Sequence, residues 1–268
     1  MTNAYPIDTT LDEIARLRIQ SDLYRSDAHQ MLSMIGVQPG WRCLDMCSGI
    51  GGITDVLNHH VGATGEVIGF ELDHEKVAVA QQWVTINGYR QVSFLCGDGF
   101  DSGLVPASFD LVHLRFALGI IPGGVKMLDH ALSLVKPGGV IFLEEADAGS
   151  LACYPEHPAW GRAVSLILEC FEKIGSDIVL GRKLNSLLNA ADVSVTHLRP
   201  CRYLLRAGEP MINHIPLTLD TLQNAIIKLG LADADTIRTT VTELLAHLRD
   251  PDVVVSSVTM VQAVGRVP

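Results

Sequence analysis

Five short, nearly continuous apolar runs alternate with stretches of helical periodicity between residues 41 and 147. A continuous apolar run is typical of a parallel strand that is buried on both faces, and the stretches between the runs have the length of crossover helices. The pattern therefore predicts successive β-α units in a doubly wound sheet. The expected strands are 41–47, 66–73, 92–98, 109–116 and 140–147, and the expected helices between them are 53–61, 74–87 and 124–135.

The segments on either side of this alternation predict further helices and two more strands. Residues 1–40 are expected to form two helices, the first of which starts at a capping box made by Thr10 and Glu13, while the second ends at Ile35. Beyond Asp147 the pattern loosens into an irregular cap over 149–160. Helices are then expected over 162–174, 181–191, 218–229 and 234–248, and strands over 193–206 and 253–265.

One domain is expected, because the chain has no internal repeat, low-complexity tract or linker. The predicted fold class is α/β, with a doubly wound, mostly parallel seven-stranded sheet of Rossmann-like type, N-terminal helices and a helical cap insertion. Its parts are expected to be an N-terminal helical segment (1–40), a cofactor-binding core (41–147), cap insertions (148–180 and 207–250) and the last strands (193–206 and 253–266).

The balance of charges narrows the classes of partner. The 268 residues carry a formal net charge of −10, and 48% are hydrophobic. An acidic field repels polyphosphates, so we expect no nucleic-acid partner. No apolar run approaches the roughly 18 residues that span a bilayer, and the N-terminus lacks the features of a secretory signal, so no membrane association and a cytoplasmic location are expected. The six cysteines lack paired spacing, which favours reduced thiols over disulfides or zinc.

Three consecutive strand-to-helix turns carry the residues of a candidate adenosine site. The first turn contains Ser48 and the glycines Gly49 and Gly51, which let backbone N–H groups approach a ligand. The second strand ends at Glu71, 22 residues beyond Gly49, where a carboxylate accepts hydrogen bonds from two ribose hydroxyls. The third ends at Asp98, which suits the exocyclic amine of adenine. Leu72 and Gly99 adjoin these acids and complete the predicted site.

This combination resembles the class I S-adenosylmethionine-dependent methyltransferases, in particular the small-molecule branch related to ubiquinone and menaquinone biosynthesis. The first motif of that family reads acidic-x-Gly-x-Gly-x-Gly, and here it is Asp45-x-Cys47-x-Gly49-x-Gly51. The resemblance covers about 12–147 well and the rest more loosely. It implies S-adenosylmethionine as cofactor and a strand order 3-2-1-4-5-7-6 with an antiparallel last strand. Cys47 departs from the family, so it must avoid a positive φ or point its side chain away from the methionine moiety.

Candidate catalytic residues follow strands four and five. His113 is a candidate general base, although a histidine on a buried strand is more often a packed core residue. Glu145 is the second candidate, because alternation along the strand turns it away from Glu144. Arg115 suits the cofactor carboxylate or an acidic acceptor, and otherwise forms a surface ion pair. No partner motif supports a metal site. Four residues are expected either to contact the acceptor or to pack the cap and the N-terminal helices: Tyr24, Tyr154, His157 and Trp160.

The sequence therefore predicts methyl transfer from S-adenosylmethionine to oxygen, nitrogen or carbon of a small, partly hydrophobic metabolite. Two alternatives remain open: a cyclase or isomerase that binds the same cofactor without methyl transfer, and a non-catalytic module that senses it. A nicotinamide-dependent oxidoreductase is disfavoured, because Thr54 replaces the third glycine of the dinucleotide fingerprint. The sequence leaves the oligomeric state open, and a homodimer is one arrangement that it allows.

Overall fold

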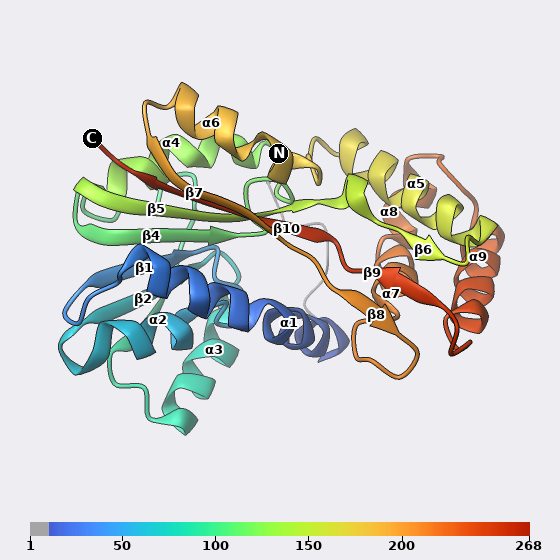
Figure 1. The fold of residues 1–268 in the computed structure, drawn as a ribbon, viewed down its shortest axis with the longest axis horizontal. Coiled ribbons are helices and arrows are strands. Elements are labelled where there is room, and N and C mark those ends of the chain that lie inside the picture. Colours follow the sequence, from blue (N-terminus) through green and yellow to red (C-terminus); the bar gives the residue numbers. More distant parts are fainter. Residues whose placement is uncertain (1–10) are drawn as a thin grey trace.

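A twisted seven-stranded sheet runs through the structure, a computed structural model that describes residues 11–268, with side chains from residue 14 onward (Figure 1). The strand order is β3-β2-β1-β4-β5-β10-β7. β10 is antiparallel to both of its neighbours, and the other pairs are parallel. This confirms the predicted fold class and strand order. The strands are β1 (Arg42–Met46), β2 (Glu66–Glu71), β3 (Val92–Cys96), β4 (Phe109–Arg115), β5 (Val135–Asp147), β7 (Ser194–Cys201) and β10 (Thr259–Arg266).

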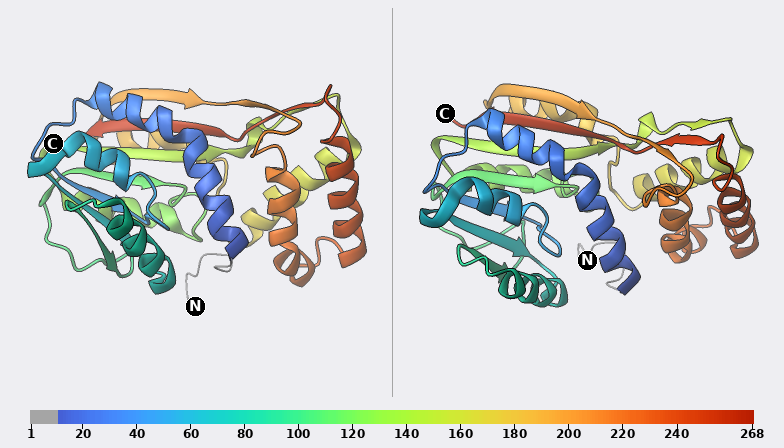
Figure 2. Two further views of the ribbon diagram at one scale, coloured as in Figure 1. Left: turned by 90° about the horizontal axis from the view of Figure 1, so that it is seen from below. Right: turned by 60° about the horizontal axis from the view of Figure 1, so that its bottom comes forward.

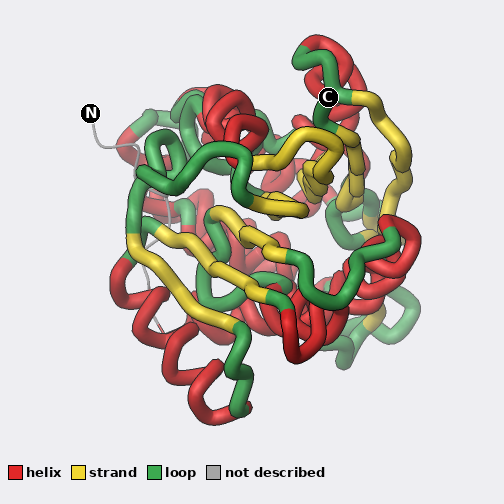
Figure 3. Tube along the Cα trace, turned by 90° about the vertical axis from the view of Figure 1, so that its left-hand side faces the viewer, coloured by secondary structure: helices red, strands yellow, loops and turns green. Residues whose placement is uncertain are grey.

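Helices cover both faces of this sheet, as the view along the strands shows (Figure 3). Successive strand residues point to opposite faces, so the fully buried Cys43 and Leu44 belong to different hydrophobic cores. Cys43 packs in the core under α1 (Leu11–Ile35), α2 (Thr54–Val61) and α3 (His74–Asn87). Leu44 packs in the core under α4 (Met127–Leu134) and α6 (Leu184–Ala190). Burial on both faces explains why these strands read as continuous apolar runs.

A cap lies beyond the ends of the long strands, on the right of Figure 1. It contains a small antiparallel sheet, β6-β9-β8, which the sequence did not predict. Its strands are β6 (Cys153–Tyr154), β8 (Leu204–Arg206) and β9 (Val254–Ser256), and its helices are α5 (Pro158–Lys173), α7 (His214–Thr221), α8 (Gln223–Lys228) and α9 (Ala234–His247). A third hydrophobic core joins these elements. Short 3-10 turns occur at Gly62–Thr64, Gly124–Lys126, Ala148–Ser150 and Leu180–Lys183.

The predicted boundaries match β1, β2, β3 and β4 to within two residues, whereas β5 begins at Val135 rather than at residue 140 and larger differences occur elsewhere. The helix expected at 74–87 is confirmed: Asp73 accepts hydrogen bonds from the amides of its first turn, and Gly88 ends it at a φ of 68°. The two N-terminal helices are instead one, α1, and the capping box lies outside the residues whose side chains are described. The two late strands are each interrupted: at 202–203 the chain passes from the main sheet into the cap, and at 257–258 it returns from the cap to the main sheet.

The single N-terminal helix matters for the site because it serves two regions. Its C-terminal half, which includes Met31 and Leu32, packs in the core with α2 and α3. Its N-terminal half continues past the sheet toward the cap helices (Figure 2). Within residues 11–268, no helix is both long and apolar enough to cross a membrane.

Candidate active site

A cavity of about 780 Å³ lies between the sheet and the cap, at the carboxyl ends of β1, β2 and β4. Open α/β sheets bind ligands at this edge, and the volume lies within the range of small-molecule sites. The half nearer the sheet is lined by the turns after β1, β2 and β3 and by the N-terminal half of α1. The half nearer the cap is mostly apolar and is lined by Ile120, Ile121, Leu151, Ile167, Phe171, Ile178, Met211, His214, Ile215 and Val258.

The turn after β1 is folded by a run of positive φ angles. Gly49 has a φ of 58°, and a Cβ added to it would meet nothing within 4 Å, so its backbone is open on that side. Gly52 has a φ of 42°, and a Cβ there would lie 2.5 Å from Asp45 Oδ2. Gly51 packs toward the side chains of Trp83 and Phe94 and does not line the cavity. The glycines therefore serve both the open face and the packed face of this turn.

Cys47 adopts the backbone conformation that a glycine favours. Its φ is 59°, which excludes the first of the two expected alternatives, avoidance of a positive φ. Its thiol lies 3.5 Å from the Sδ atom of Met127. A Cβ on Gly99 would come within 2.9 Å of that same Sδ atom, so Gly99 leaves room for these sulfur atoms. Burial, followed by the charge of Glu71, raises the pKa of the Cys47 thiol well above its usual range, which keeps it protonated and unreactive.

Glu71 and Asp98 lie on the same cavity, as the sequence predicted for two residues of one adenosine site. Glu71 Oε2 accepts a hydrogen bond from Gly49 N at 2.9 Å, and Oε1 accepts from the amides of Leu72 and Asp73 at 3.0 and 3.1 Å. A carboxylate has about four acceptor positions, so one remains on Oε2 for a ligand hydroxyl. Asp98 Oδ1 accepts from Phe100 N at 2.9 Å, and its side chain is exposed.

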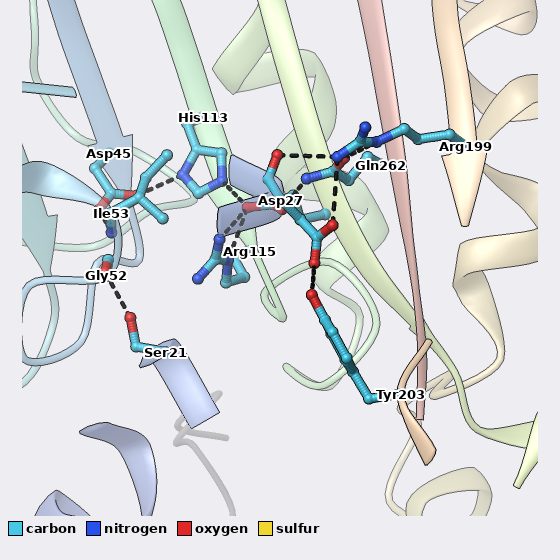
Figure 4. Close-up of polar contacts among 11 residues, drawn as sticks. Ser21, Asp27, Asp45, Gly52, Ile53, His113, Arg115, Arg199, Tyr203 and Gln262 are labelled. Atoms are coloured by element: carbon cyan, nitrogen blue, oxygen red, sulfur yellow. Dashed lines mark hydrogen bonds and ion pairs between the residues drawn. The ribbon is translucent and has the colours of Figure 1, made fainter. Parts of the chain in front are cut away.

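A buried chain of polar groups runs under the turn, from β1 through β4 to β5 (Figure 4). Asp45 accepts hydrogen bonds from Ile53 N at 3.1 Å and from His113 Nδ1 at 2.7 Å. The other ring nitrogen, Nε2, lies 2.9 Å from Glu144 Oε2, which also accepts from Arg115 Nε at 2.7 Å. Ionised carboxylates only accept hydrogen bonds, so a carboxylate beside each ring nitrogen favours the imidazolium form of His113, in which both nitrogens donate.

The electrostatics of this chain agree with its geometry. Burial alone would lower the pKa of His113, but Asp45 and then Glu144 raise it above its ordinary value. Burial alone would raise the pKa of Glu144, but Arg115 and then His113 lower it to about 2. Both shifts favour the charged form of the group, and each of these two buried side chains has a group of opposite charge beside it.

The same chain of contacts reaches α1 from the other side. Gln262 donates from Nε2 to Glu144 Oε1 at 2.7 Å and accepts from Arg199 Nε at 2.6 Å. Arg199 donates to the backbone carbonyl of Asp27 on α1 at 3.1 Å, and Tyr203 donates to the carboxylate of Asp27. Figure 4 shows Arg199 and Tyr203 both contacting Asp27. The network therefore ties the helix that lines the cavity to the centre of the sheet.

A second contact ties α1 directly to the turn after β1. Ser21 Oγ donates to the carbonyl of Gly52 at 2.9 Å, as Figure 4 shows. Tyr24, three residues later, is only 1% exposed, lines the cavity and donates to Val258 O at 2.8 Å. The N-terminal half of α1 is therefore a fixed wall of the cavity in this structure.

Two buried polar atoms in the sheet half of the cavity lack protein partners. Arg115 lines the cavity, and its Nη1 atom has no hydrogen-bond partner within residues 11–268. Ser48 also lines the cavity, and its Oγ atom likewise has none among those residues. Burying an unpaired polar group costs free energy, so such atoms beside a cavity indicate where a ligand would bind.

The two residues expected to act as acid or base lie away from the cavity. His113 is fully buried with both ring nitrogens bonded, and it does not line the cavity. Glu145 is also fully buried: it accepts hydrogen bonds from the amides of Ala117, Leu118 and Gly119, and burial raises its pKa to about 7. Its opposite orientation from Glu144 matches the predicted alternation. The geometry gives both residues a structural environment and does not support the catalytic roles expected for them.

Of the four residues expected to contact the acceptor, the structure places Tyr24 alone on the cavity wall. Tyr154 is 74% exposed on β6, outside the cavity. His157 caps α5, accepting from Ala159 N, and stacks on His247. Trp160 is buried in the cap core, where its ring meets that of His214 edge to face. Aromatic residues early in the cap thus build the cap rather than line the cavity.

His214, in contrast, lines the cavity and was not predicted. It begins α7, far along the chain from the turns after β1, β2 and β3, and its neighbours in sequence carry no motif. Only the tertiary packing of α7 brings it to the cavity, so no local signal would have found it. Within residues 11–268, no group of three or more histidine, cysteine or acidic side chains is arranged to hold a metal ion.

Comparison with known sequences connects the chain to a family of methyltransferases. The model of the ubiE/COQ5 methyltransferase family matches residues 10–158, more than half of the chain. The demethylmenaquinone methyltransferase of Bacillus cytotoxicus is 33% identical over 116 residues, which are 43% of this chain and 49% of that protein. The Bacillus pumilus enzyme of the same name is 31% identical over 110 residues, 41% of this chain and 47% of that protein. The chain thus spans about half the length of the curated relatives it matches.

Solved structures share the fold at low identity. A SAM-dependent methyltransferase from Aquifex aeolicus is similar with a TM-score of 0.56 and 18% identity, over 71% of this chain and 92% of that chain. At this identity the likeness concerns the fold alone.

Proposed function

The chain belongs to the ubiE/COQ5 methyltransferase family, and we propose that it transfers the methyl group of S-adenosylmethionine to a small, partly apolar acceptor. One observation carries the proposal: Glu71, Asp98 and the glycine turn after β1 border a single cavity, although they follow three different strands. A cavity of about 780 Å³ has room for a nucleoside cofactor together with a second small molecule. The mostly apolar cap half supports an acceptor that is itself largely apolar.

The described residues fit an adenosylated amino acid. Glu71 would hold the ribose through its free acceptor position, and Asp98 would accept from the adenine amine. The turn 47–52 would lie against the methionine part, where Arg115 Nη1 and Ser48 Oγ are still without partners. Arg115 offers a donor to a carboxylate, and Ser48 Oγ accepts from an ammonium group. When bound, S-adenosylmethionine supplies a methyl group on a positively charged sulfur.

The protein's own contribution would be positioning and exclusion of water. Tyr24 and its neighbours on α1 close one side of the cavity, and apolar side chains close the cap side. Holding two reactants in line at short distance contributes several kcal/mol to the lowering of a barrier. The network through Glu144 fixes Arg115 and, through Asp45, the turn after β1. No protein base on the cavity wall is required where the acceptor nucleophile is already deprotonated.

The remaining predictions about partners rest on the sequence. A net charge of −10 supports a small-molecule acceptor rather than a nucleic acid. The cytoplasmic location and the homodimeric state stay predictions. Static light scattering, which measures the molar mass in solution, tests the homodimer.

Calorimetric titration with S-adenosylhomocysteine, the demethylated cofactor, tests the proposal. We expect binding by the wild type and a loss of about tenfold to a hundredfold in affinity for Glu71→Gln, since a hydrogen bond to a charged group contributes about 1.5–3 kcal/mol. Glu66→Gln is the matched control, because Glu66 begins the same strand and does not line the cavity. Absence of binding to the wild type, with binding of NADH instead, would overturn the proposed function.

A further inference from the structure

The cap half of the cavity presents few polar atoms, and most of its hydroxyl groups already donate to protein carbonyls. Thr218 Oγ1 donates to His214 O at 2.7 Å, and Thr221 Oγ1 donates to Leu217 O at 2.8 Å. Ser257 Oγ donates to Val258 O at 3.0 Å. An occupant of this half therefore meets apolar side chains and hydroxyl groups whose hydrogens are engaged.

His214 differs from these groups. Its Nδ1 atom lies 2.9 Å from the carbonyl oxygen of Met211, and its Nε2 atom is buried with no hydrogen-bond partner within residues 11–268. The ring of Trp160 packs edge to face with that of His214, with their centroids 6.2 Å apart. The imidazole is therefore fixed in orientation by a hydrogen bond and by packing, while one of its nitrogens has no partner.

The contact with Met211 determines which nitrogen carries the hydrogen. A carbonyl oxygen only accepts, so Nδ1 must donate, and the neutral ring then has a lone pair on Nε2. Burial lowers the pKa of His214 to about 4, so the ring is neutral at pH 7. A buried acceptor without a partner costs about 1–3 kcal/mol, which a ligand recovers if it brings a hydrogen-bond donor.

We propose that His214 determines acceptor specificity, by accepting a hydrogen bond at Nε2 from a hydroxyl or N–H group on an otherwise apolar acceptor. The inference rests on the proposed function in so far as it treats the occupant of the cap half as the methyl acceptor. It identifies the class of acceptor as an apolar molecule with at least one hydroxyl or N–H donor. An apolar molecule without a donor leaves Nε2 unpaired and binds less tightly.

Two probes of the same shape test this inference: 1-naphthol, which carries a hydroxyl donor, and 1-methoxynaphthalene, which does not. Binding is followed by tryptophan fluorescence, since Trp160 contacts His214. We expect the wild type to bind 1-naphthol about tenfold more tightly, the ratio typical of one net hydrogen bond. Equal affinity of the wild type for 1-naphthol and 1-methoxynaphthalene, or binding of neither probe, would overturn the inference.

Two variants assign the effect to Nε2. His214→Asn keeps an amide donor close to the position of Nδ1 but has no atom in place of Nε2, so the preference should fall to about one. His214→Gln places an amide oxygen near the position of Nε2 and should restore part of the preference. His197→Asn is the control, because His197 lies on β7 away from the cavity. A preference that persists in His214→Asn would contradict the inference.

The cofactor is titrated separately into each variant. S-adenosylhomocysteine should bind all of them equally, which also shows that they are folded. If S-adenosylhomocysteine fails to bind the wild type while the naphthol preference holds, the proposed function fails and recognition of a donor by His214 stands. If S-adenosylhomocysteine binds but the preference for 1-naphthol is absent, recognition of a donor by His214 fails and the proposed function stands.

Discussion

Replacing Glu144 by glutamine should make the stability of the protein less sensitive to acid. Glu144 is fully buried and accepts hydrogen bonds from His113, Arg115 and Gln262. Burial opposes its ionisation, but Arg115 and His113 outweigh it and lower the pKa from 4.5 to about 2. The folded protein therefore binds this proton less readily than the unfolded chain does. Ionised Glu144 stabilises the fold above pH 4.5, and this contribution is lost as the pH falls toward 2.

The size of the effect follows from the shift in pKa. Each factor of ten in the proton affinity corresponds to about 1.4 kcal/mol, so ionised Glu144 contributes about 3 kcal/mol to the free energy of unfolding. About 2 kcal/mol of this is lost between pH 5.5 and pH 3, because the unfolded carboxylate is largely protonated at the lower pH. The side chain is inaccessible to solvent, so no screening by water reduces the figure.

Urea unfolding at pH 5.5 and pH 3 measures this contribution. The difference in free energy of unfolding between the wild type and Glu144→Gln should shrink by about 2 kcal/mol at the lower pH. Glu66→Gln makes the same chemical change at a half-exposed ion pair with Arg42, and its difference from the wild type should stay nearly constant. An equal gap between the wild type and Glu144→Gln at both pH values would refute the reasoning.

Two further predictions concern the wall of the cavity. Arg115→Lys should weaken binding of S-adenosylhomocysteine about tenfold and leave binding of 5′-methylthioadenosine, which lacks the carboxylate, unchanged. Equal losses of affinity for both ligands would contradict a contact between Arg115 and the cofactor carboxylate. A loss of affinity for an acidic acceptor alone would assign Arg115 to the acceptor. Gly52→Ala should reduce the free energy of unfolding by about 1–3 kcal/mol, because its Cβ would lie 2.5 Å from Asp45 Oδ2 at a position with a positive φ. Gly161→Ala in α5 is the control, since a Cβ there meets nothing within 4 Å. In the same urea assay this control should be neutral or stabilising.

The sequence predicts the central sheet well because both of its faces are buried. Strands β1, β2, β4 and β5 are buried on both faces and contain apolar runs. Glu71 at the end of β2 and Asp98 just after β3 stand out against this pattern. The sequence thus assigns Glu71 and Asp98 to the same edge of the sheet. The strand order came from the family resemblance, since the apolar pattern by itself does not order strands.

The cap could not be predicted to the same depth, because its site residues depend on tertiary packing. Tyr154 and Trp160 are aromatic and precede or begin α5, yet one is exposed and the other lies in the cap core. His214 reaches the cavity from a helix that no motif marks. Histidine is a common catalytic residue type, but both ring nitrogens of His113 are hydrogen-bonded, one to Asp45 and the other to Glu144. These contacts join strands that are far apart in sequence, and spacing along the chain does not encode them.

The central claim is that one ligand is bound jointly by the turns after β1, β2 and β3. A crystal structure of the protein with S-adenosylhomocysteine tests it most directly. The account predicts a ribose hydroxyl at Glu71, the adenine amine at Asp98 and the amino acid part at the turn 47–52 beside Arg115. Density for the nucleoside elsewhere, or contact with only one of the two acids, would contradict it.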